Sequence, residues 1–409
     1  MKKKLMLLGG IRYLLPVIKK AHELGAHVIT ADYLPDNIAH GYSDEYVNVS
    51  IMDKESVLKV AVEKKIDGIM SFACDPGVAT AAYVAEKMGL PFQCSYDAAA
   101  ILQDKGRFRQ FLIENGFNCP KARSYSSKEE ALADMSSARA DGRRPQFPVI
   151  VKPVDSAGSK GCIRADSKSE LPSAIDVALE NGHNGRVIIE DFLTFESYHS
   201  STDPFTVDGK IVSMTYSDQL FDKEAENPYT PAFIIWPSSM AKRHQGYLTS
   251  EIQRLFGLLG MKTGIYNIET VVGEGGIPYI MEVSPRGGGC KIAEIQQMAY
   301  GANLIENEIR KALSMPLNLA TEHEVSGHWC EMILHARPGQ TGRFQALEIA
   351  ECMKNKVRAI DMTVKPGDVV HPFSGANMSL GDIFLQFESR EELDAAISDT
   401  SRWLDIKLA

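Results

Sequence analysis

The chain has 409 residues, of which 44% are hydrophobic and 24% charged. That length allows about two to four domains of roughly 100–200 residues each. The formal net charge of −9 disfavours nucleic acid as a partner, because phosphate backbones attract basic surfaces. The seven cysteines include no C-x-x-C pair, so neither a zinc site nor a disulfide framework is indicated and a reducing cytoplasm is expected.

The first ten residues, MKKKLMLLGG, place a basic run before apolar residues, as a secretory signal peptide does. Gly9, Gly10 and Arg12 interrupt the apolar stretch before it reaches the usual length, so we expect a first β-strand here. No later segment approaches the roughly 18 uninterrupted apolar residues that a membrane-spanning helix needs. The sequence therefore predicts no membrane partner.

Residues 1–98 alternate strand-like and helix-like segments, which predicts an open, parallel, Rossmann-like α/β sheet. The expected strands are residues 4–10, 27–33, 46–51, 67–72 and 90–94. The glycine turn after the first strand and Asp32 suggest a dinucleotide site, but GGIRYL lacks the third glycine of that fingerprint, which weakens this interpretation. Asp75, just past the fourth strand, is a candidate substrate contact and equally a candidate helix N-cap.

A nucleotide cradle is indicated where an apolar strand ends at Lys152. The loop that follows is rich in small residues from Ser156 to Gly161, and such residues let backbone N–H groups close over phosphates while the lysine supplies a point charge. The lysine precedes this loop rather than ending it, so the loop is not a Walker loop. A glycine turn after a strand lysine is common and does not establish a nucleotide site by itself.

The next strand ends in an acidic residue, Glu190. The backbone of the short segment after it can read the edge of an adenine ring. Glu196, six residues on, can accept hydrogen bonds from ribose hydroxyls.

Glu269 and Glu282 each lie among apolar and β-branched residues, with a glycine-rich turn between the two segments, which predicts a β-hairpin. Both carboxylates can therefore face one pocket, and oxygen ligands on rigid strands suit Mg²⁺, which usually shares its shell with nucleotide phosphates. Arg286 follows at the start of the turn PRGGG, where it can meet a phosphate or carboxylate bidentately. A surface hairpin with solvated charges explains either glutamate alone, but the pair together with PRGGG favours a metal site.

Taken in order, the segments QDKGRFRQFLIENG, VIVKPVDSAGSKG, IIEDFLTFE, YNIETVV and YIMEVSPRGGG resemble the ATP-grasp superfamily from Lys105 to Gly289. The chain is similar to its carboxylate–amine ligases, such as L-amino-acid ligases, and to the ATP-binding domains of carbamoyl-phosphate synthase and biotin carboxylase. The resemblance implies a mixed α/β and α+β protein with the ATP-grasp fold. We expect an N-terminal Rossmann-like domain at residues 1–98, an ATP-grasp domain at 99–318 and a C-terminal α+β domain at 319–409. ATP would lie between a small lobe, about 120–190, and a large lobe, about 193–318.

The resemblance also implies which residues bind ATP. They are Lys105, Lys152, Gly158, Ser159, Lys160, Gly161, Glu190, Asp191, Phe192, Leu193 and Glu196. Lys105 and Lys152 match the nucleotide-phosphate lysines, and residues 158–161 match the mobile loop over the β- and γ-phosphates. Residues 190–193 match the segment beside adenine, and Glu196 matches the ribose-binding acid.

For the metal, the resemblance implies two Mg²⁺ ions, with Mn²⁺ as an alternative, held by Glu269 and by a bridging Glu282. Arg286 and Lys152 are the expected catalytic residues, Arg286 stabilising the transferred phosphate. The family usually has asparagine two residues after the bridging glutamate, where this chain has Ser284. A hydroxyl ligates Mg²⁺ more weakly than an amide carbonyl, so Ser284 is a candidate ligand that departs from the pattern.

The reaction implied is transfer of the γ-phosphoryl group of ATP to a carboxylate, giving an acyl phosphate and ADP, followed by attack of an amine. We therefore expect a ligase that forms carbon–nitrogen bonds between small molecules, with amino acids as a candidate substrate class. A homodimer is compatible with this assignment. One alternative is a carbamoyl-phosphate type of enzyme that phosphorylates bicarbonate; SPRGGGCKIAEIQ in place of RLQVEH argues against biotin carboxylation itself. The other is a regulatory ATP-binding protein without turnover, against which the retained lysines, glutamates and Arg286 argue.

Several other residues have both a functional and a purely structural interpretation. His199 is expected on a strand facing solvent, although it could contact substrate. Cys290 lies near the reacting centre, but no neighbouring histidine lowers its pKa, so we do not expect a nucleophile. Tyr229, Phe233 and Trp236 can shape an apolar substrate pocket or pack in a core.

Overall fold

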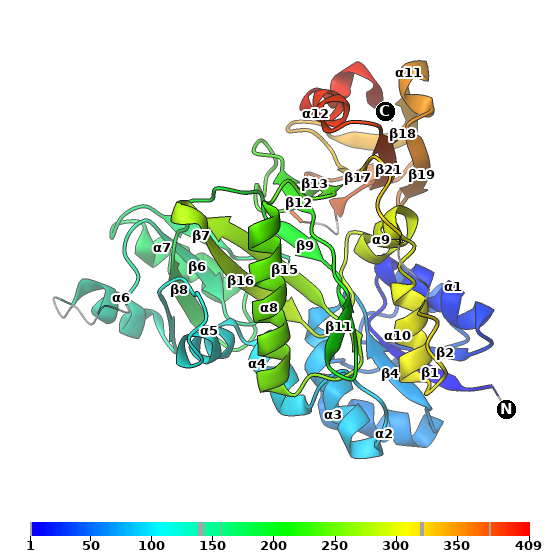
Figure 1. The fold of residues 1–409 in the computed structure, drawn as a ribbon, viewed down its shortest axis with the longest axis horizontal. Helices are drawn as coiled ribbons and strands as arrows, with labels where there is room; N and C mark the ends of the chain where they lie inside the picture. Colours follow the sequence, from blue (N-terminus) through cyan, green and yellow to red (C-terminus); the bar gives the residue numbers. More distant parts are fainter. Residues whose placement is uncertain (1, 138–141, 143, 157, 320–322, 376–377) are drawn as a thin grey trace.

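The computed structural model describes residues 2–137, 142, 144–156, 158–319, 323–375 and 378–409. Figure 1 shows the N-terminal sheet, the small lobe and the C-terminal sheet as three regions around the long helix α8 (Lys242–Leu259) and the strands β15 (Asn267–Gly273) and β16 (Ile277–Ser284). No helix in these ranges is both long and apolar enough to span a bilayer.

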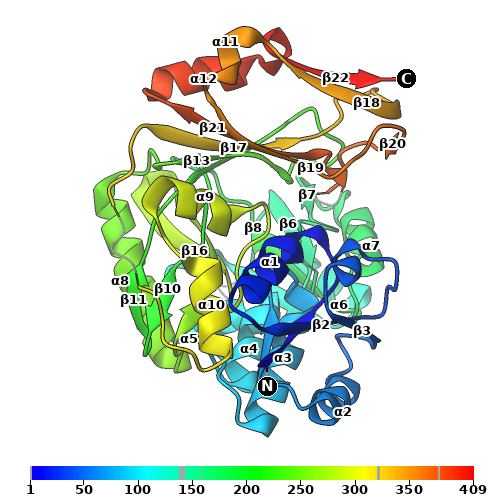
Figure 2. The same ribbon diagram turned by 90° about the vertical axis from the view of Figure 1, so that its right-hand side faces the viewer.

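The N-terminal region is the predicted parallel sheet, with strand order β3-β2-β1-β4. Its strands and helices are β1 (Lys4–Leu8), α1 (Leu15–Glu23), β2 (His27–Asp32), β3 (Glu45–Asn48), α2 (Lys54–Lys64), β4 (Gly68–Ser71), α3 (Val78–Met88) and α4 (Tyr96–Gln103). Four apolar residues of β1 in a row are fully buried, as expected for a strand covered by helices on both faces. Figure 2 shows α1 lying beside α10 (Leu304–Ala312), so one of the covering helices comes from a distant part of the chain.

The expected fifth strand at residues 90–94 is wrong, because this segment pairs with no strand of the sheet. Gln93 explains the difference. Its carbonyl accepts the Lys262 N–H at 2.8 Å, its side-chain oxygen accepts from Lys311 at 2.8 Å, and its side-chain N–H donates to the Pro285 carbonyl. These bonds hold the segment against the large lobe and away from the sheet.

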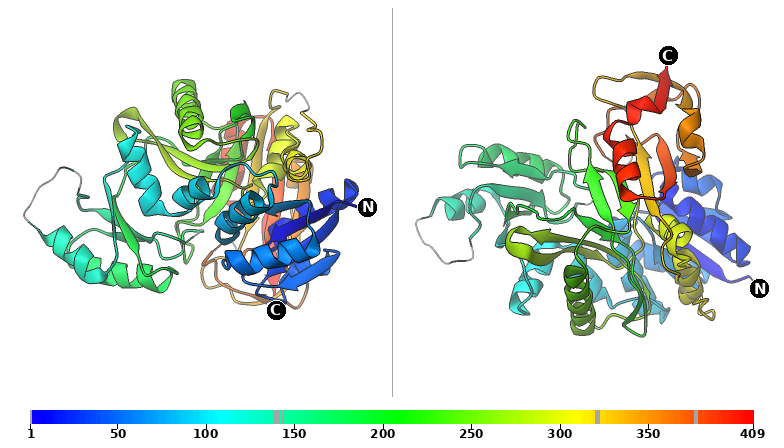
Figure 3. Two further views of the ribbon diagram at one scale, coloured as in Figure 1. Left: turned by 90° about the horizontal axis from the view of Figure 1, so that it is seen from below. Right: turned by 45° about the horizontal axis from the view of Figure 1, so that its top comes forward.

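The small lobe is a four-stranded antiparallel sheet of order β5-β8-β6-β7 covered by helices. Its elements, with the helix that leads into it, are α5 (Lys105–Glu114), β5 (Ala122–Tyr125), α6 (Lys128–Ser136), β6 (Val149–Pro153), β7 (Ile163–Ala165), α7 (Leu171–Glu180) and β8 (Val187–Asp191). Figure 3 shows this lobe standing out to one side of the molecule.

The large lobe contributes the hairpin strands and several short strands. Besides α10, its elements are β9 (Ser200–Thr202), β10 (Phe205–Val207), β11 (Lys210–Ser213), β12 (Asp218–Phe221), β13 (Pro231–Trp236), α8 (Lys242–Leu259), β14 (Gly264–Ile265), β15 (Asn267–Gly273), β16 (Ile277–Ser284) and α9 (Ile292–Tyr300). The strand order β16-β15-β9 places the hairpin next to β9.

The C-terminal region adds β17 (His328–Leu334), β18 (Gly342–Ile349), α11 (Glu351–Lys354), β19 (Val357–Met362), β20 (Val369–Val370), β21 (Gly381–Phe387), α12 (Arg390–Ser398) and β22 (Leu404–Leu408). A five-stranded sheet of order β12-β13-β17-β21-β19 takes strands from both sides of the expected boundary at residue 318. One face of this sheet packs on α9 through Ile234, Trp236 and Phe384. The other face forms a core with α12, including Ile235, Leu385 and Leu393. The large lobe and the C-terminal region therefore share one sheet.

Candidate active site

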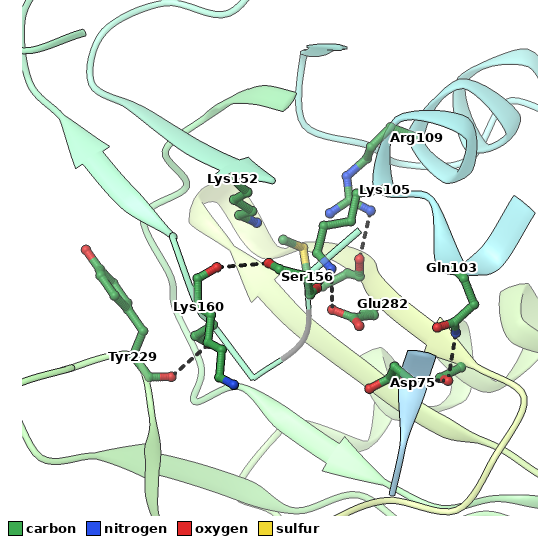
Figure 4. A network of polar contacts seen from close by, with 12 residues as sticks. Asp75, Gln103, Lys105, Arg109, Lys152, Ser156, Lys160, Tyr229 and Glu282 are labelled. Atoms are coloured by element: carbon green, nitrogen blue, oxygen red, sulfur yellow. Dashed lines mark hydrogen bonds and ion pairs between the residues drawn. The ribbon is translucent and has the colours of Figure 1, made fainter. Parts of the chain in front are cut away.

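Two lysines that the sequence assigns to phosphates lie close to the hairpin. Lys105 is the first residue of α5, after the N-cap Asp104. Its Nζ donates to the Ser156 carbonyl at 2.8 Å and lies 3.7 Å from Oε2 of Glu282. Figure 4 shows Lys105 between Ser156 and Glu282, with Lys152 nearby on β6. The Lys105 ammonium thus contacts both the small-residue loop and Glu282, one of the two candidate metal ligands.

Lys152 is held by a buried group of three charges. Its Nζ donates to Oε2 of Glu190 at 2.8 Å, and Nε of Arg109 lies 2.6 Å from Oε1 of the same carboxylate. Burial alone would raise the pKa of Glu190, but the charges of Arg109 and Lys152 outweigh it and lower this pKa to about 2. The Glu190 carboxylate is therefore engaged through both oxygens and anchors Lys152. Sequence reasoning missed Arg109, although it follows Lys105 by four residues on one face of a helix.

The segment expected beside adenine keeps one backbone donor free. The N–H groups of Asp191 and Phe192 donate to the carbonyls of Lys121 and Pro148, at 2.9 and 3.0 Å. Within the described ranges the Leu193 N–H has no partner, so it alone of these three can donate to a purine ring. The Arg164 guanidinium lies 4.2 Å over the Phe192 ring, which fixes one side of the segment.

Glu196 lies next to the hairpin turn. Its Oε1 accepts the Gly275 N–H at 2.8 Å, and its own N–H donates to the Val272 carbonyl at 2.9 Å. The side chain is exposed, so its second carboxylate oxygen can meet a ribose hydroxyl.

The predicted hairpin is confirmed. β15 and β16 pair antiparallel across a turn at Glu274–Gly276, with Glu269 opposite Glu282 and Asn267 opposite Ser284. Directly opposed residues of an antiparallel pair share a face, with Cβ atoms about 4.5–5.5 Å apart. The two glutamates therefore point to the same side of the sheet, as the metal site requires.

Glu269 also has a partner that the sequence did not indicate. Nδ1 of His199 lies 2.7 Å from Oε1 of Glu269, and the imidazole is enclosed by the rings of Phe195 and Phe221. The interpretation of His199 as a solvent-facing residue is therefore wrong. Burial would raise the pKa of Glu269, but the hydrogen bond and charge of His199, with the charges of Lys152 and Lys105, bring this pKa below its ordinary value.

Arg286 is buried and paired with the N-terminal region. Its Nε and Nη2 donate to the two oxygens of Asp75, at 2.9 and 2.6 Å. Burial would raise the pKa of Asp75, but the charge of Arg286 and the hydrogen bonds from Arg286 and Ser284 lower it. Asp75 is not the N-cap of α3, which is Gly77. It brings the N-terminal region into the site by orienting Arg286.

Ser284 belongs to the same group of contacts. Its hydroxyl donates to Oδ1 of Asp75 at 2.7 Å and accepts from Nε2 of Gln103 at 2.9 Å. These bonds engage the donor and one acceptor position of the hydroxyl, so one lone pair is left for a ligand. Sequence reasoning missed Gln103 as it missed Arg109.

The small-residue loop has the backbone that its composition predicts. Gly158, Ser159 and Gly161 have φ of 66°, 58° and 70°, a region that glycine adopts without strain. Ser159 donates to the Tyr229 carbonyl at 3.2 Å, and Ser156 donates to the Lys160 carbonyl at 2.9 Å. A contact between the loop and the β12–β13 connection is visible in Figure 4.

The three aromatic residues considered for one substrate pocket lie apart. Trp236 is fully buried in the core against α9, where its Nε1 donates to Thr215 at 3.2 Å. Phe233 lies on the opposite face of β13, and Tyr229 belongs to the loop contact. For Cys290, burial and then the charges of Glu331 and Asp382 raise the thiol pKa, which agrees with the expectation that it is no nucleophile.

The paired carboxylates of Glu269 and Glu282 are candidate ligands for Mg²⁺. In the described part of the chain, no group of three or more His, Cys, Asp or Glu side chains could hold a metal ion. Two opposed glutamates supply part of an octahedral shell, and phosphate oxygens and water complete it in nucleotide sites. The residues therefore fit Mg²⁺ that arrives with a nucleotide.

Comparison with known proteins agrees with this geometry. Residues 102–290 match the ATP-grasp domain family. The chain is 25% identical over 268 residues to the carbamoyl phosphate synthase arginine-specific large chain of Bacillus subtilis, covering 64% of this chain and 24% of that protein. The chain thus spans about a quarter of the length of this curated relative.

Solved structures share the fold over the whole chain. The L-amino acid ligase from Bacillus licheniformis has a TM-score of 0.79 at 20% identity, covering 100% of this chain and 99% of that one. The biotin carboxylase domain of Hydrogenobacter thermophilus 2-oxoglutarate carboxylase, solved with MgADP, ADP and bicarbonate, has a TM-score of 0.73 at 16% identity, covering 100% of this chain and 91% of that one. The chain therefore contains an ATP-grasp domain at residues 102–290, within the fold that these proteins share.

Proposed function

We propose that this protein is an ATP-dependent carboxylate–amine ligase that forms an acyl phosphate and releases ADP and phosphate. The observation that carries the proposal is the pairing of Glu269 with Glu282 beside Lys105, whose Nζ lies 3.7 Å from Glu282. Carboxylates for a metal and a cation for phosphate lie side by side there. A phosphoryl-transfer site needs both.

ATP would lie between the small lobe and the hairpin. The free Leu193 N–H meets adenine, Glu196 meets ribose, and Lys105 and Lys152 meet the phosphates, with residues 158–161 over them. Glu269 and Glu282, with Ser284 as a further candidate, would hold two Mg²⁺ ions, which would supply charge neutralisation at the γ-phosphate. Mn²⁺ is the alternative ion.

This chain's own residues contribute position and charge. Glu190 holds the Lys152 ammonium in place, and His199 keeps Glu269 ionised and oriented. Asp75 holds the Arg286 guanidinium at the end of β16, where it would stabilise the phosphoryl group as it moves to the acceptor oxygen. The amine then attacks the acyl carbonyl and phosphate leaves, without a covalent bond to the protein.

Amino acids are the proposed substrate class, since the L-amino acid ligase fold matches along the full chain. Bicarbonate chemistry is the second candidate, because a carbamoyl phosphate synthase is among the sequence relatives. Beyond the substrates, we propose a cytoplasmic protein with no nucleic-acid or membrane partner, and a homodimer is compatible with the assignment.

The test measures ADP, AMP and phosphate from ATP and Mg²⁺ with a panel of amino-acid pairs, small carboxylates with amines, and bicarbonate. We expect slow ADP release from the protein alone and faster release with one carboxylate–amine pair. A response to bicarbonate without any other carboxylate would favour the second candidate. AMP and pyrophosphate as products would contradict the proposal.

A further inference from the structure

A separate cavity of about 400 Å³ lies in the C-terminal region, outside the residues assigned to ATP. It is enclosed by the outer face of the five-stranded sheet, the segment after β12, and the end of the chain from α12 to β22. A volume of this size is typical of small-molecule sites.

The floor of the cavity is apolar. Phe233 on β13 and Met332 on β17 are opposed in register, so both side chains face the cavity side of the sheet, and Leu334 follows Met332 on that face. Ile397 and Leu404 line the cavity on the side opposite the sheet. An apolar body of a ligand therefore finds apolar contacts on two walls.

The mouth of the cavity carries cations without partners. Lys223 and Arg337 line it, both are exposed, and within the described ranges neither side chain has an ion pair or hydrogen bond. The acids Asp399 and Asp405 are already paired, with Arg402 at 2.9 Å and with Lys407 at 2.6 Å. Asp222 is paired with His335 at 3.1 Å. Among the described residues that line the cavity, Glu224 is the remaining acid without a pair, against two such cations, so the unpaired groups favour an anion over a cation.

The wall of the cavity reaches the nucleotide site along two contacts. Phe221, at one end of the wall segment, lies with its ring 5.5 Å from the imidazole of His199, which holds Glu269. Tyr229, at the other end of the same connection, accepts the hydrogen bond from Ser159 of the phosphate loop. A ligand that orders residues 221–229 would therefore act on both parts of the ATP site.

We propose that this cavity is an effector site for a small amphipathic carboxylate, whose apolar body lies on the floor and whose carboxylate pairs with the cations at the mouth. Occupancy favours the conformation in which residues 221–229 contact the phosphate loop, and so tightens nucleotide binding. This site is distinct from the proposed ligase centre, and binding there does not require turnover.

The probe is 3-phenylpropanoate, titrated calorimetrically into the full chain without nucleotide, with 3-phenylpropanamide as the uncharged control. The same titration is carried out with three variants. Arg337→Gln removes a cation of the mouth, and Ile397→Trp fills the floor from a half-buried position on α12. Arg358→Gln is the matched control, because Arg358 is exposed, is hydrogen-bonded to Gln386 and Asn355, and lies with both partners outside the cavity lining.

We expect saturable binding of the carboxylate to the wild type and much weaker binding of the amide. Arg337→Gln should weaken binding by about tenfold, since a charge-assisted hydrogen bond is lost. Ile397→Trp should abolish binding, and Arg358→Gln should leave it unchanged. The carboxylate should also raise ADP affinity in the wild type and not in Ile397→Trp. Equal binding by the wild type and Ile397→Trp would place the ligand elsewhere and overturn the site. No binding by the folded wild type, or an unchanged ADP affinity, would overturn the proposal as stated, and failure of the ligase assay alone would leave it standing.

Discussion

Replacing Glu190 with glutamine tests the buried charges that hold Lys152. The variant keeps the shape of the side chain but leaves Arg109 and Lys152 without a counter-charge, and Arg109 is 4% exposed. Breaking a buried ion pair by removing one partner costs about 3–5 kcal/mol. The pKa of Glu190 gives a second figure for the same loss of stability. Its shift from 4.5 to about 2 corresponds to about 3 kcal/mol in the free energy of unfolding.

The same shift fixes the pH dependence. The pKa of Glu190 is depressed in the folded protein, so its contribution is fully present above the unfolded value of 4.5 and is lost as pH falls toward about 2. The wild type should lose stability across that window, and Glu190→Gln should lose less. At neutral pH the variant should be the less stable of the two.

Hydrogen exchange of the β6 and β8 amides measures this locally, because it reports the free energy of opening of these strands. Asp176→Asn in the same lobe is the matched control: Asp176 pairs with Lys128 at the surface, and exposed pairs contribute less than about 1 kcal/mol. If Glu190→Gln and Asp176→Asn changed the opening free energy equally, the buried group would not anchor Lys152 and the reasoning would be refuted.

Four further outcomes follow from the site. Glu282→Gln should abolish ADP formation with an unchanged circular dichroism spectrum, because a half-exposed carboxylate at the phosphates is lost without disturbing a core; turnover at the wild-type rate would remove the metal assignment. Asp75→Asn should lower kcat more than it raises the KM for ATP, since Asp75 positions Arg286, and an equal change in a Glu55→Gln control would point to a general effect. Residues 158–161 should exchange amide hydrogens more slowly with an ATP analogue and Mg²⁺ than without, and identical exchange would mean that the loop does not cover ATP. For Glu331, burial and then the charges of Asp382 and Glu294 raise the pKa well above 4.5; stability is therefore lost as pH rises above that value, and Glu331→Gln should raise Tm relative to the wild type more at about pH 8 than at about pH 5.

Local sequence patterns were sufficient to predict the secondary-structure elements of the proposed nucleotide site. The hairpin with Glu269 and Glu282 was predictable because β-branched residues on both sides of a glycine turn specify strands and register over a short range. The strand ending near Lys152 and the positive φ of the loop after it also follow from neighbouring residues. The parallel N-terminal sheet follows from its alternating pattern, apart from residues 90–94, where apolar composition was insufficient because Gln93 bonds to distant parts of the chain.

The tertiary structure decided which charges meet. Arg109 with Glu190, Asp75 with Arg286 and His199 with Glu269 are 81, 211 and 70 positions apart by residue number, and no short-range pattern records such pairs. The sheet shared across residue 318 has the same origin, since β13 pairs with β17 from the C-terminal region. The sequence alone thus determined which residue types are available for nucleotide chemistry. Their positioning depends on long-range packing, which places the charges of these three pairs beside partners from other parts of the chain, because an unpaired buried charge is costly.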